Sequence, residues 1–182
     1  HRYIRRQRQM CIRDRYPFKE GILFPNTYFY KKDMLASSIL KQSYNKLDLV
    51  LSELWSKKPP NNILKDKNEA LILASIIEKE AGNDNEKSLI ASVFLKRIEI
   101  GMRLQADPTI IYGLLPNFDG DIKKSDILDK NNPYNTYMIK SLPPTPIAIP
   151  SLTSIEAAVL STPGEYLFCL LYTSDAADEC SG

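Results

Sequence analysis

The chain has 182 residues, with 24 Lys and Arg against 22 Asp and Glu, so its formal charge is +2. This length suits one domain with a sizeable core, and the hydrophobic share of 43% and charged share of 25% are ordinary for a soluble globular protein. No apolar stretch reaches the roughly 18 residues that a membrane-spanning helix needs, and a charge this small neither favours nor excludes a nucleic-acid partner.

The two ends of the chain, residues 1–15 and 169–182, are predicted not to belong to the natural protein. One choice of codons for residues 1–14, followed by the first two bases of an Arg15 codon, has a reverse complement that encodes residues 169–182 residue for residue. One DNA segment therefore flanks the gene in both orientations, and its internal part resembles an adapter of transposon-based sequencing libraries. Such segments are excluded before the fold is considered.

Without these flanks, the natural segment is residues 16–168. It has 153 residues, 18 basic and 18 acidic, and it contains neither Cys nor His, because all three Cys and the one His lie in the flanks. Thiol nucleophiles, Ser/His/Asp triads, disulfides and Cys/His zinc sites are thereby excluded. The chemistry must come from carboxylates, Lys, Tyr, hydroxyls or amides.

The first half of this segment is predicted to hold a loop and two helices. Residues 16–30 are aromatic and interrupted by Pro and Gly, which is typical of a turn-rich loop with short extended pieces. Asp33 is a suitable N-cap for a helix over 34–55, which Pro59 and Pro60 bring to an end. A second helix is expected over 67–81, closed by the glycine that follows.

Three further helices are expected, separated by loops. A capping-box pattern, Asn83 with Glu86 three residues later, predicts a helix that ends at Gly101. Residues 102–113 are expected to be extended or looped around an Asp-Pro turn, and a short helix is expected over 124–129.

The last part of the segment begins with a loop. Residues 132–150 contain five Pro and are expected to form no regular element. Ser151 or Thr153 can cap a helix over 154–160, and a strand is expected to begin at Glu165. The predicted fold class is therefore α+β, mainly helical.

Glu80 is the leading candidate for a catalytic acid. At 100° per residue it shares the most apolar stripe of the helix over 67–81 with Leu73, Ile76 and Ile77, whereas Glu78 lies on a more polar side. Partial burial and the negative end of the helix dipole both raise the pKa of a carboxyl group there, as general acid catalysis on a glycosidic oxygen requires. The alternative is a boundary Glu that simply reaches solvent.

Two polar stretches could supply substrate contacts. Gln105 and Asp107 lie in a stretch of polar groups set among apolar residues, and Tyr134, Asn135 and Tyr137 are residue types suited to stacking on sugars and bonding hydroxyls. Each stretch also has a purely structural interpretation. Arg97 and Asp107 could form an internal ion pair, and the sequence PYNTY could be a plain Pro/Asn turn.

Together these stretches resemble the endolytic murein transglycosylases, the YceG-like family of lytic enzymes. The matching segments occur in the family's order and spacing and cover nearly all of residues 16–168; they are EGILFPNTY (20–28), ASIIEKEAG (74–82), ASVFLKRIEIGMRLQADPTIIYGL (91–114), PYNTYMIKSLPPTPIAIP (133–150) and SIEAAVLSTP (154–163).

The resemblance implies a lysozyme-like catalytic domain that cuts nascent peptidoglycan strands and leaves 1,6-anhydroMurNAc ends. The family's catalytic Glu corresponds to Glu80, the second carboxylate of EKE, with no metal or cofactor. The implied partners are glycan strands and the cell-wall synthesis machinery, with no nucleic acid. Two alternatives remain open, a hydrolase in which Asp107 activates water beside Glu80, and a non-catalytic glycan-binding scaffold.

The chain also departs from the family pattern. Where the family usually has GLPPGPI, residues 141–147 read SLPPTPI. The family's membrane anchor and LysM-like module are expected to precede Tyr16, and its closing strands to follow Phe168, so the segment would be part of a longer protein. The resemblance places that protein at the periplasmic, extracytoplasmic face of the bacterial inner membrane.

Overall fold

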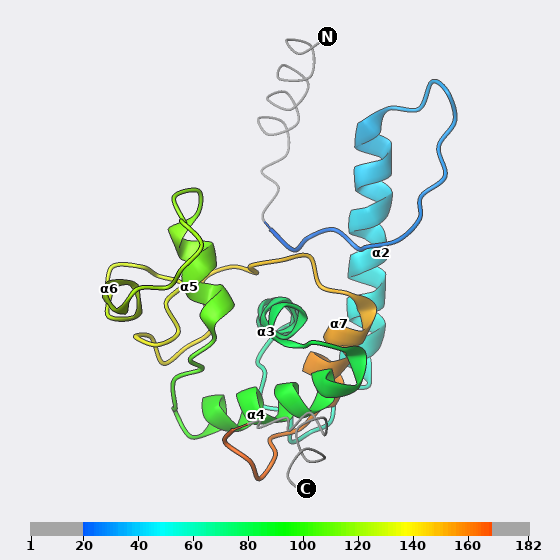
Figure 1. The fold of residues 1–182 in the computed structure, drawn as a ribbon. Helices are drawn as coiled ribbons and strands as arrows, with labels where there is room; N and C mark the ends of the chain where they lie inside the picture. The colour runs from blue at the N-terminus through cyan, green and yellow to red at the C-terminus, as the bar shows by residue number, and fades with distance from the viewer. Residues whose placement is uncertain (1–19, 169–182) are drawn as a thin grey trace, which may run out of the picture.

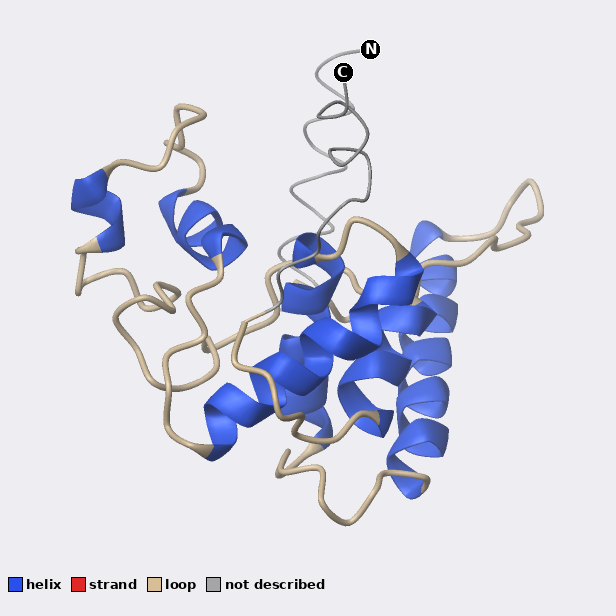
Figure 2. Cartoon of the chain, turned by 60° about the horizontal axis from the view of Figure 1, so that its bottom comes forward, coloured by secondary structure: helices blue, strands red, loops and turns tan. Residues whose placement is uncertain are grey.

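The computed structural model describes residues 20–168, and within this range all regular structure is helical (Figures 1 and 2). The elements in chain order are α2 (Ala36–Ser56), α3 (Lys67–Glu80), a 3-10 turn η1 (Asp84–Glu86), α4 (Lys87–Glu99), α5 (Asp107–Leu114), α6 (Lys124–Ile127) and α7 (Leu152–Leu160). None of these helices is both long and apolar enough to cross a bilayer. The flanks 1–15 and 169–182 lie outside the described residues.

The prediction of a mainly helical fold is confirmed, but its β component is not found within residues 20–168. The strand expected at Glu165 does not form. In its place, Gly164 N donates to Ser92 O (3.1 Å) and Leu167 O accepts from Arg97 Nε (2.9 Å). The backbone of this segment is therefore satisfied partly by α4, and no neighbouring strand is described beside it.

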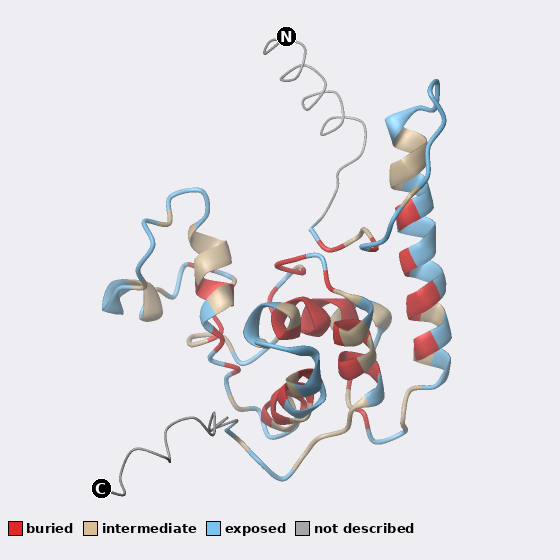
Figure 3. Ribbon diagram, turned by 45° about the vertical axis from the view of Figure 1, so that its right-hand side comes forward, coloured by how far each residue is buried: buried red, intermediate tan, exposed pale blue. Residues whose placement is uncertain are grey.

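Helix α3 forms the centre of the domain. Every residue from Ala70 to Ile77 is buried, and α7, α4, α2 and α5 all contact this helix. Figure 3 shows it as the most continuously buried element, whereas α2 buries only the side that faces the body. The Asp66 side chain caps the start of α3 by accepting from Glu69 N (2.8 Å). A helix buried on most sides is apolar nearly all round, as this one is between its polar first and last turns.

Helix α2 begins later than predicted, and Asp33 is not its N-cap. Asp33 lies inside a turn closed by Met34 N donating to Lys31 O (3.0 Å). The helix follows an extended residue, Leu35, and no side chain caps it. Because the loop before it has its own turn, the helix starts two residues after the expected position.

The connection between α3 and α4 differs in detail from a capping box. Asn83 Oδ1 accepts from Asn85 N (3.0 Å) and so caps the 3-10 turn, while Glu86 Oε2 accepts from Gly82 N (3.1 Å). Helix α4 starts only at Lys87. At its other end, the expected glycine stop is confirmed, because Gly101 has φ +66° and Met102 N donates to Arg97 O (2.7 Å) in a Schellman arrangement.

Residues 102–113 are predicted to be extended or looped, but from Asp107 onward this segment is a helix, α5 (Asp107–Leu114). Its first residues are Asp107 and Pro108. The first turn of a helix has no intrahelical use for its N–H groups, so Pro fits there, and a negative side chain is favoured at that end. An Asp-Pro pair therefore serves as a helix start here and not as a turn.

The proline-rich segment 132–150 forms no helix or strand, as predicted, and crosses α3 before entering α7 (Figure 1). Ile147 N donates to Ser75 Oγ (3.0 Å) on α3. Of the two predicted caps for α7, Ser151 is the N-cap, and its hydroxyl accepts from Ser154 N (3.4 Å). The segment thus passes over the helix that carries Glu80. We call residues 132–150 the crossing loop.

Candidate active site at the end of helix α3

Glu80 is the last residue of α3, so the helix ends one residue before the predicted end at Ala81. Its side chain is exposed to solvent, yet its carboxyl group is surrounded by enough protein to be desolvated. Burial, followed by the negative charge of Asp107, raises its pKa to about 7, against the opposing charge of Arg97. Both the accessibility and the pKa matter, because a general acid must be reachable by a substrate and still carry its proton near neutral pH.

Asp107 and Tyr137 form a hydrogen-bonded pair beside this acid. Tyr137 Oη donates to Asp107 Oδ1 (2.6 Å). Burial, this hydrogen bond and the charges of Asp107 and Glu80 raise the pKa of Tyr137 to about 12, so it stays a donor. Asp107 is exposed at the start of α5. Two sequence-predicted residues, distant in the chain, thus meet near Glu80.

Buried hydroxyl groups bring this pair together. Thr136 Oγ1 accepts from Ala106 N (2.9 Å) and lies 2.9 Å from Thr109 Oγ1, and both Thr side chains are fully buried. Gln105 N donates to Thr136 O (3.1 Å). The crossing loop is therefore fixed to the first turn of α5, and the residue after Thr136 is held beside Asp107.

Arg97 does not form the ion pair with Asp107 that one interpretation of the sequence proposes. Its guanidinium donates to Leu104 O and to Leu167 O, and it lies over the Phe168 ring at 5.1 Å from the centroid. Arg97 thus joins α4 to the segment that follows it and to the end of the described residues, while its charge still acts on Glu80.

The other predicted contact residues have different positions. Gln105 is exposed in a left-handed conformation, with φ +53°. Tyr134 is half-buried, bonds Thr145 Oγ1 through its hydroxyl (2.8 Å) and packs edge-on against Tyr112. Asn135 is fully buried; its amide donates to three backbone carbonyls at the end of α6, those of Asp126, Ile127 and Asp129. Its position suits holding the loop and does not fit direct substrate contact.

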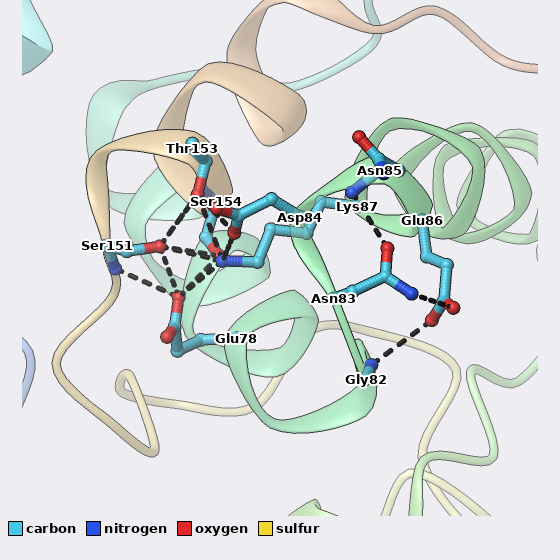
Figure 4. Close-up of polar contacts among 10 residues, drawn as sticks. All are labelled: Glu78, Gly82, Asn83, Asp84, Asn85, Glu86, Lys87, Ser151, Thr153 and Ser154. Carbon is cyan, nitrogen blue, oxygen red and sulfur yellow. Dashed lines mark hydrogen bonds and ion pairs between the residues drawn. The ribbon is translucent and has the colours of Figure 1, made fainter.

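Glu78 belongs to a polar cluster that the sequence did not single out (Figure 4). Burial alone would raise its pKa, but hydrogen bonds from Ser151, Ser154 and Lys87 lower it to about 2. We call Glu78, Asp84, Lys87, Ser151, Thr153 and Ser154 the Lys87 cluster. The partners are up to 76 positions apart in the chain, so only a signal of long-range pairing could have found them.

One pocket among the described residues, of about 370 Å³, does not include Glu80 in its lining. It is lined by residues of η1, α4, α7 and the residue after α7, among them Asp84, Ser88, Glu156 and Leu160. Within residues 20–168, no group of three or more His, Cys, Asp or Glu is arranged to hold a metal ion. The site brings the carboxyl groups of Glu80 and Asp107 together with the hydroxyl group of Tyr137.

The YceG-like family model matches residues 3–178 of the sequence. The chain belongs to the YceG-like family. In the Listeria monocytogenes crystal structure described as a yceG-like protein, the fold is shared with a TM-score of 0.69 at 33% identity, over 84% of this chain and 49% of that one.

Curated relatives of this YceG-like chain carry an enzyme name. An endolytic murein transglycosylase of Bacillus subtilis is 36% identical over 152 residues, which are 83% of this chain and 41% of the relative. One of Streptococcus pneumoniae is 33% identical over 152 residues, which are 82% of this chain and 27% of the relative. The chain therefore spans less than half the length of either relative.

Proposed function

We propose that the protein contains the catalytic site of a peptidoglycan lytic transglycosylase that cuts the MurNAc–GlcNAc bond within nascent glycan strands. The observation that carries this proposal is Glu80, an accessible carboxyl group with a pKa of about 7, at the end of the central helix. The relatives named endolytic murein transglycosylase supply the class of substrate.

In the proposed reaction Glu80 acts first as an acid and then as a base. Its carboxyl proton passes to the oxygen that bridges MurNAc C1 and the next GlcNAc, and the C1–O bond breaks. The resulting carboxylate accepts the proton of the MurNAc 6-hydroxyl, whose oxygen bonds to C1 and closes the 1,6-anhydro ring. Glu80 ends protonated and no water is consumed. The nucleophile belongs to the substrate, so a second protein carboxylate to activate water is unnecessary.

Glu80→Gln tests this assignment. The amide keeps the shape of the side chain but cannot exchange the proton, so we expect turnover of glycan strands to fall by at least about 100-fold while strand binding persists. Glu99→Gln, on the exposed end of α4, is the matched control. Turnover unchanged in Glu80→Gln would reject the proposal, and glycan binding without any turnover in the unaltered protein would favour the scaffold.

A hydrolase is the second candidate, and the Asp107 position favours it. Asp107 is an exposed carboxylate close enough to raise the pKa of Glu80, and hydrolases use two carboxyl groups, one to protonate the bond and one to activate water. Mass spectrometry of the products separates the two reactions. The transglycosylase leaves a terminal MurNAc lighter by one water than the reducing end that a hydrolase leaves.

Substrate contact is proposed for Gln105, Asp107, Tyr134 and Tyr137. Gln105 and Asp107 are exposed and Tyr134 and Tyr137 half-exposed, so each can offer a hydrogen bond or a ring edge to a sugar. Asn135 would act indirectly, because its amide is occupied by the end of α6.

The proposed substrate also implies where the parent protein works. Glycan strands are assembled outside the cytoplasm, so we place the site at the extracytoplasmic, periplasmic face of the inner membrane, near the synthesis machinery, in a lysozyme-like domain. Fractionation of cells that produce the parent protein checks this placement. Recovery in the cytosol alone would contradict it.

A further inference from the structure

The last turn of α3 carries two acids on different sides of the helix. Glu78 and Glu80 are two residues apart, which is about 200° around the axis. Glu80 is close to Asp107 and Arg97, whereas Glu78 bonds to the start of α7. Both acids oppose the helix dipole at this end, and Ala81 is already extended. This turn is therefore prone to fray unless contacts outside the helix hold it.

The Lys87 cluster supplies such contacts (Figure 4). Glu78 Oε2 accepts from Ser151 N (3.0 Å), Ser151 Oγ (2.6 Å), Ser154 Oγ (2.6 Å) and Lys87 Nζ (3.2 Å). Four donors on one carboxylate oxygen stabilise the charged form and leave the side chain little freedom to move.

Lys87 is the centre of the cluster. Its side chain is only 7% exposed, yet it carries a charge, which Glu78 (3.2 Å) and Asp84 (2.7 Å) balance. Ser151 Oγ (2.9 Å) and Thr153 Oγ1 (3.0 Å) complete its hydrogen bonds. Removing one partner from a buried charged pair leaves the other uncompensated, so the cluster acts as a unit. It joins the end of α3, η1, the start of α4 and the start of α7.

A second contact reinforces the same turn from the other side. Glu86 Oε2 accepts from Gly82 N (3.1 Å), two residues after Glu80. Glu80 therefore lies between two fixed points, Glu78 before it and Gly82 after it. Its own side chain remains exposed, so these neighbours, more than packing of the side chain itself, determine where its carboxyl group lies.

We propose that Glu78 and Lys87 are positioning residues, which hold the last turn of α3 so that the Glu80 carboxyl group meets the glycosidic oxygen. This inference rests on the proposed function, since it assigns Glu80 as the acid. It gives the first carboxylate of EKE a role distinct from that of the second. A displacement on the order of 1 Å of a catalytic group can cost about 100-fold in rate.

Glu78→Gln tests the proposal, with Glu99→Gln as control. We expect kcat on soluble glycan strands to fall by about 10- to 100-fold with KM within about twofold. In this variant Glu80 should leave its position among Asp107 of α5, Arg97 of α4 and Tyr137 of the crossing loop. Its pKa should then fall toward the ordinary carboxyl range, so the limb of the pH–rate profile that reports Glu80 should move to lower pH. Partial unfolding alone would lower the amplitude without moving the limb.

A milder variant keeps the test usable if Glu78→Gln does not fold. Ser154→Ala removes one of four donors to Glu78 and no charge, and we expect a smaller drop in kcat with the same direction of limb shift. Folded variants with the kcat and pH profile of Glu99→Gln would overturn the inference. Should Glu80→Gln be inactive and Glu78→Gln fully active, only this inference fails; should Glu80→Gln be active, the proposed function itself fails.

Discussion

At the scale of single residues, Glu78 and Glu80 show how position sets acidity. They have the same side chain, two residues apart. Four donors hold the pKa of Glu78 at about 2, whereas burial and the charge of Asp107 raise that of Glu80 to about 7. Pairs of acids with separated pKa values are typical of enzyme sites, because one group must keep its proton while another keeps its charge.

The charge of Asp107 gives a test at this scale. Glu80 must be protonated to act as an acid, so activity should decline as the pH rises through about 7. Asp107→Asn removes a negative charge that raises the pKa of Glu80, so the alkaline limb should move to lower pH. The measurement is kcat against pH, with Asp119→Asn, an exposed residue paired with Lys123, as control. A limb that stays or moves upward would contradict the electrostatic role.

The sequence alone predicts Glu80 but not its partners. The apolar stripe of α3 is a local pattern, so a helical wheel finds the residue that ends it. Three of the four hydrogen bonds to Glu78 come from residues more than 70 positions away, which no local pattern records. Asn135 illustrates the converse. Its polar side chain suggested ligand contact, but the unsatisfied carbonyls at the end of α6 require a donor there.

At the scale of elements, the apolar helices were the most predictable and the helix starts the least. The apolar patterns of α3 and α4, and the glycine that ends α4 at Gly101, are strong local signals in the sequence. Helix α5 was missed because Asp-Pro serves both turns and helix starts, and only tertiary contacts decide between them. Those contacts are the buried hydroxyls that join α5 to the crossing loop.

Thr136→Val tests that junction. Val matches Thr in shape but leaves the buried Ala106 N without its acceptor, which lies 2.9 Å away. We expect the free energy of unfolding to fall by about 1–3 kcal/mol, together with reduced activity, because Tyr137 would lose its fixed place beside Asp107. Denaturant titration measures the first effect. Thr27→Val, at an exposed position, is the control, and equal stability of the two variants would count against the junction.

At the scale of the whole molecule, Asn62 joins segments nearly 100 residues apart. Its side-chain NH2 group donates to Ala158 O (3.0 Å), Val159 O (3.0 Å) and Ser161 O (2.8 Å), and these contacts cap the end of α7. Its side-chain carbonyl accepts from Leu64 N (3.0 Å). The side chain is only 2% exposed. One residue between α2 and α3 thus fixes the end of α7 to the segment that leads into α3.

Asn62→Ala should therefore destabilise the whole domain and not one loop. Loss of the hydrogen bonds of this buried amide predicts a fall of roughly 2–4 kcal/mol in the free energy of unfolding, seen as one cooperative shift in thermal denaturation. Asn61→Ala, at the exposed neighbouring position, should be near neutral. Two separate transitions in the Asn62 variant would show that α7 unfolds independently.

The two acids at the end of α3 also make folding itself a proton-exchange reaction. Near pH 6 the chain takes up a proton at Glu80 when it folds, because the pKa of this group is 4.5 in the unfolded chain and about 7 in the folded one. The free energy of unfolding therefore falls as the pH increases from 4.5 to about 7. Near pH 3 the chain releases a proton at Glu78 when it folds, because the pKa of this group is 4.5 in the unfolded chain and about 2 in the folded one. The free energy of unfolding therefore falls as the pH decreases from 4.5 to about 2. These two groups together favour a stability maximum in mildly acidic solution, below the pH at which Glu80 becomes a base.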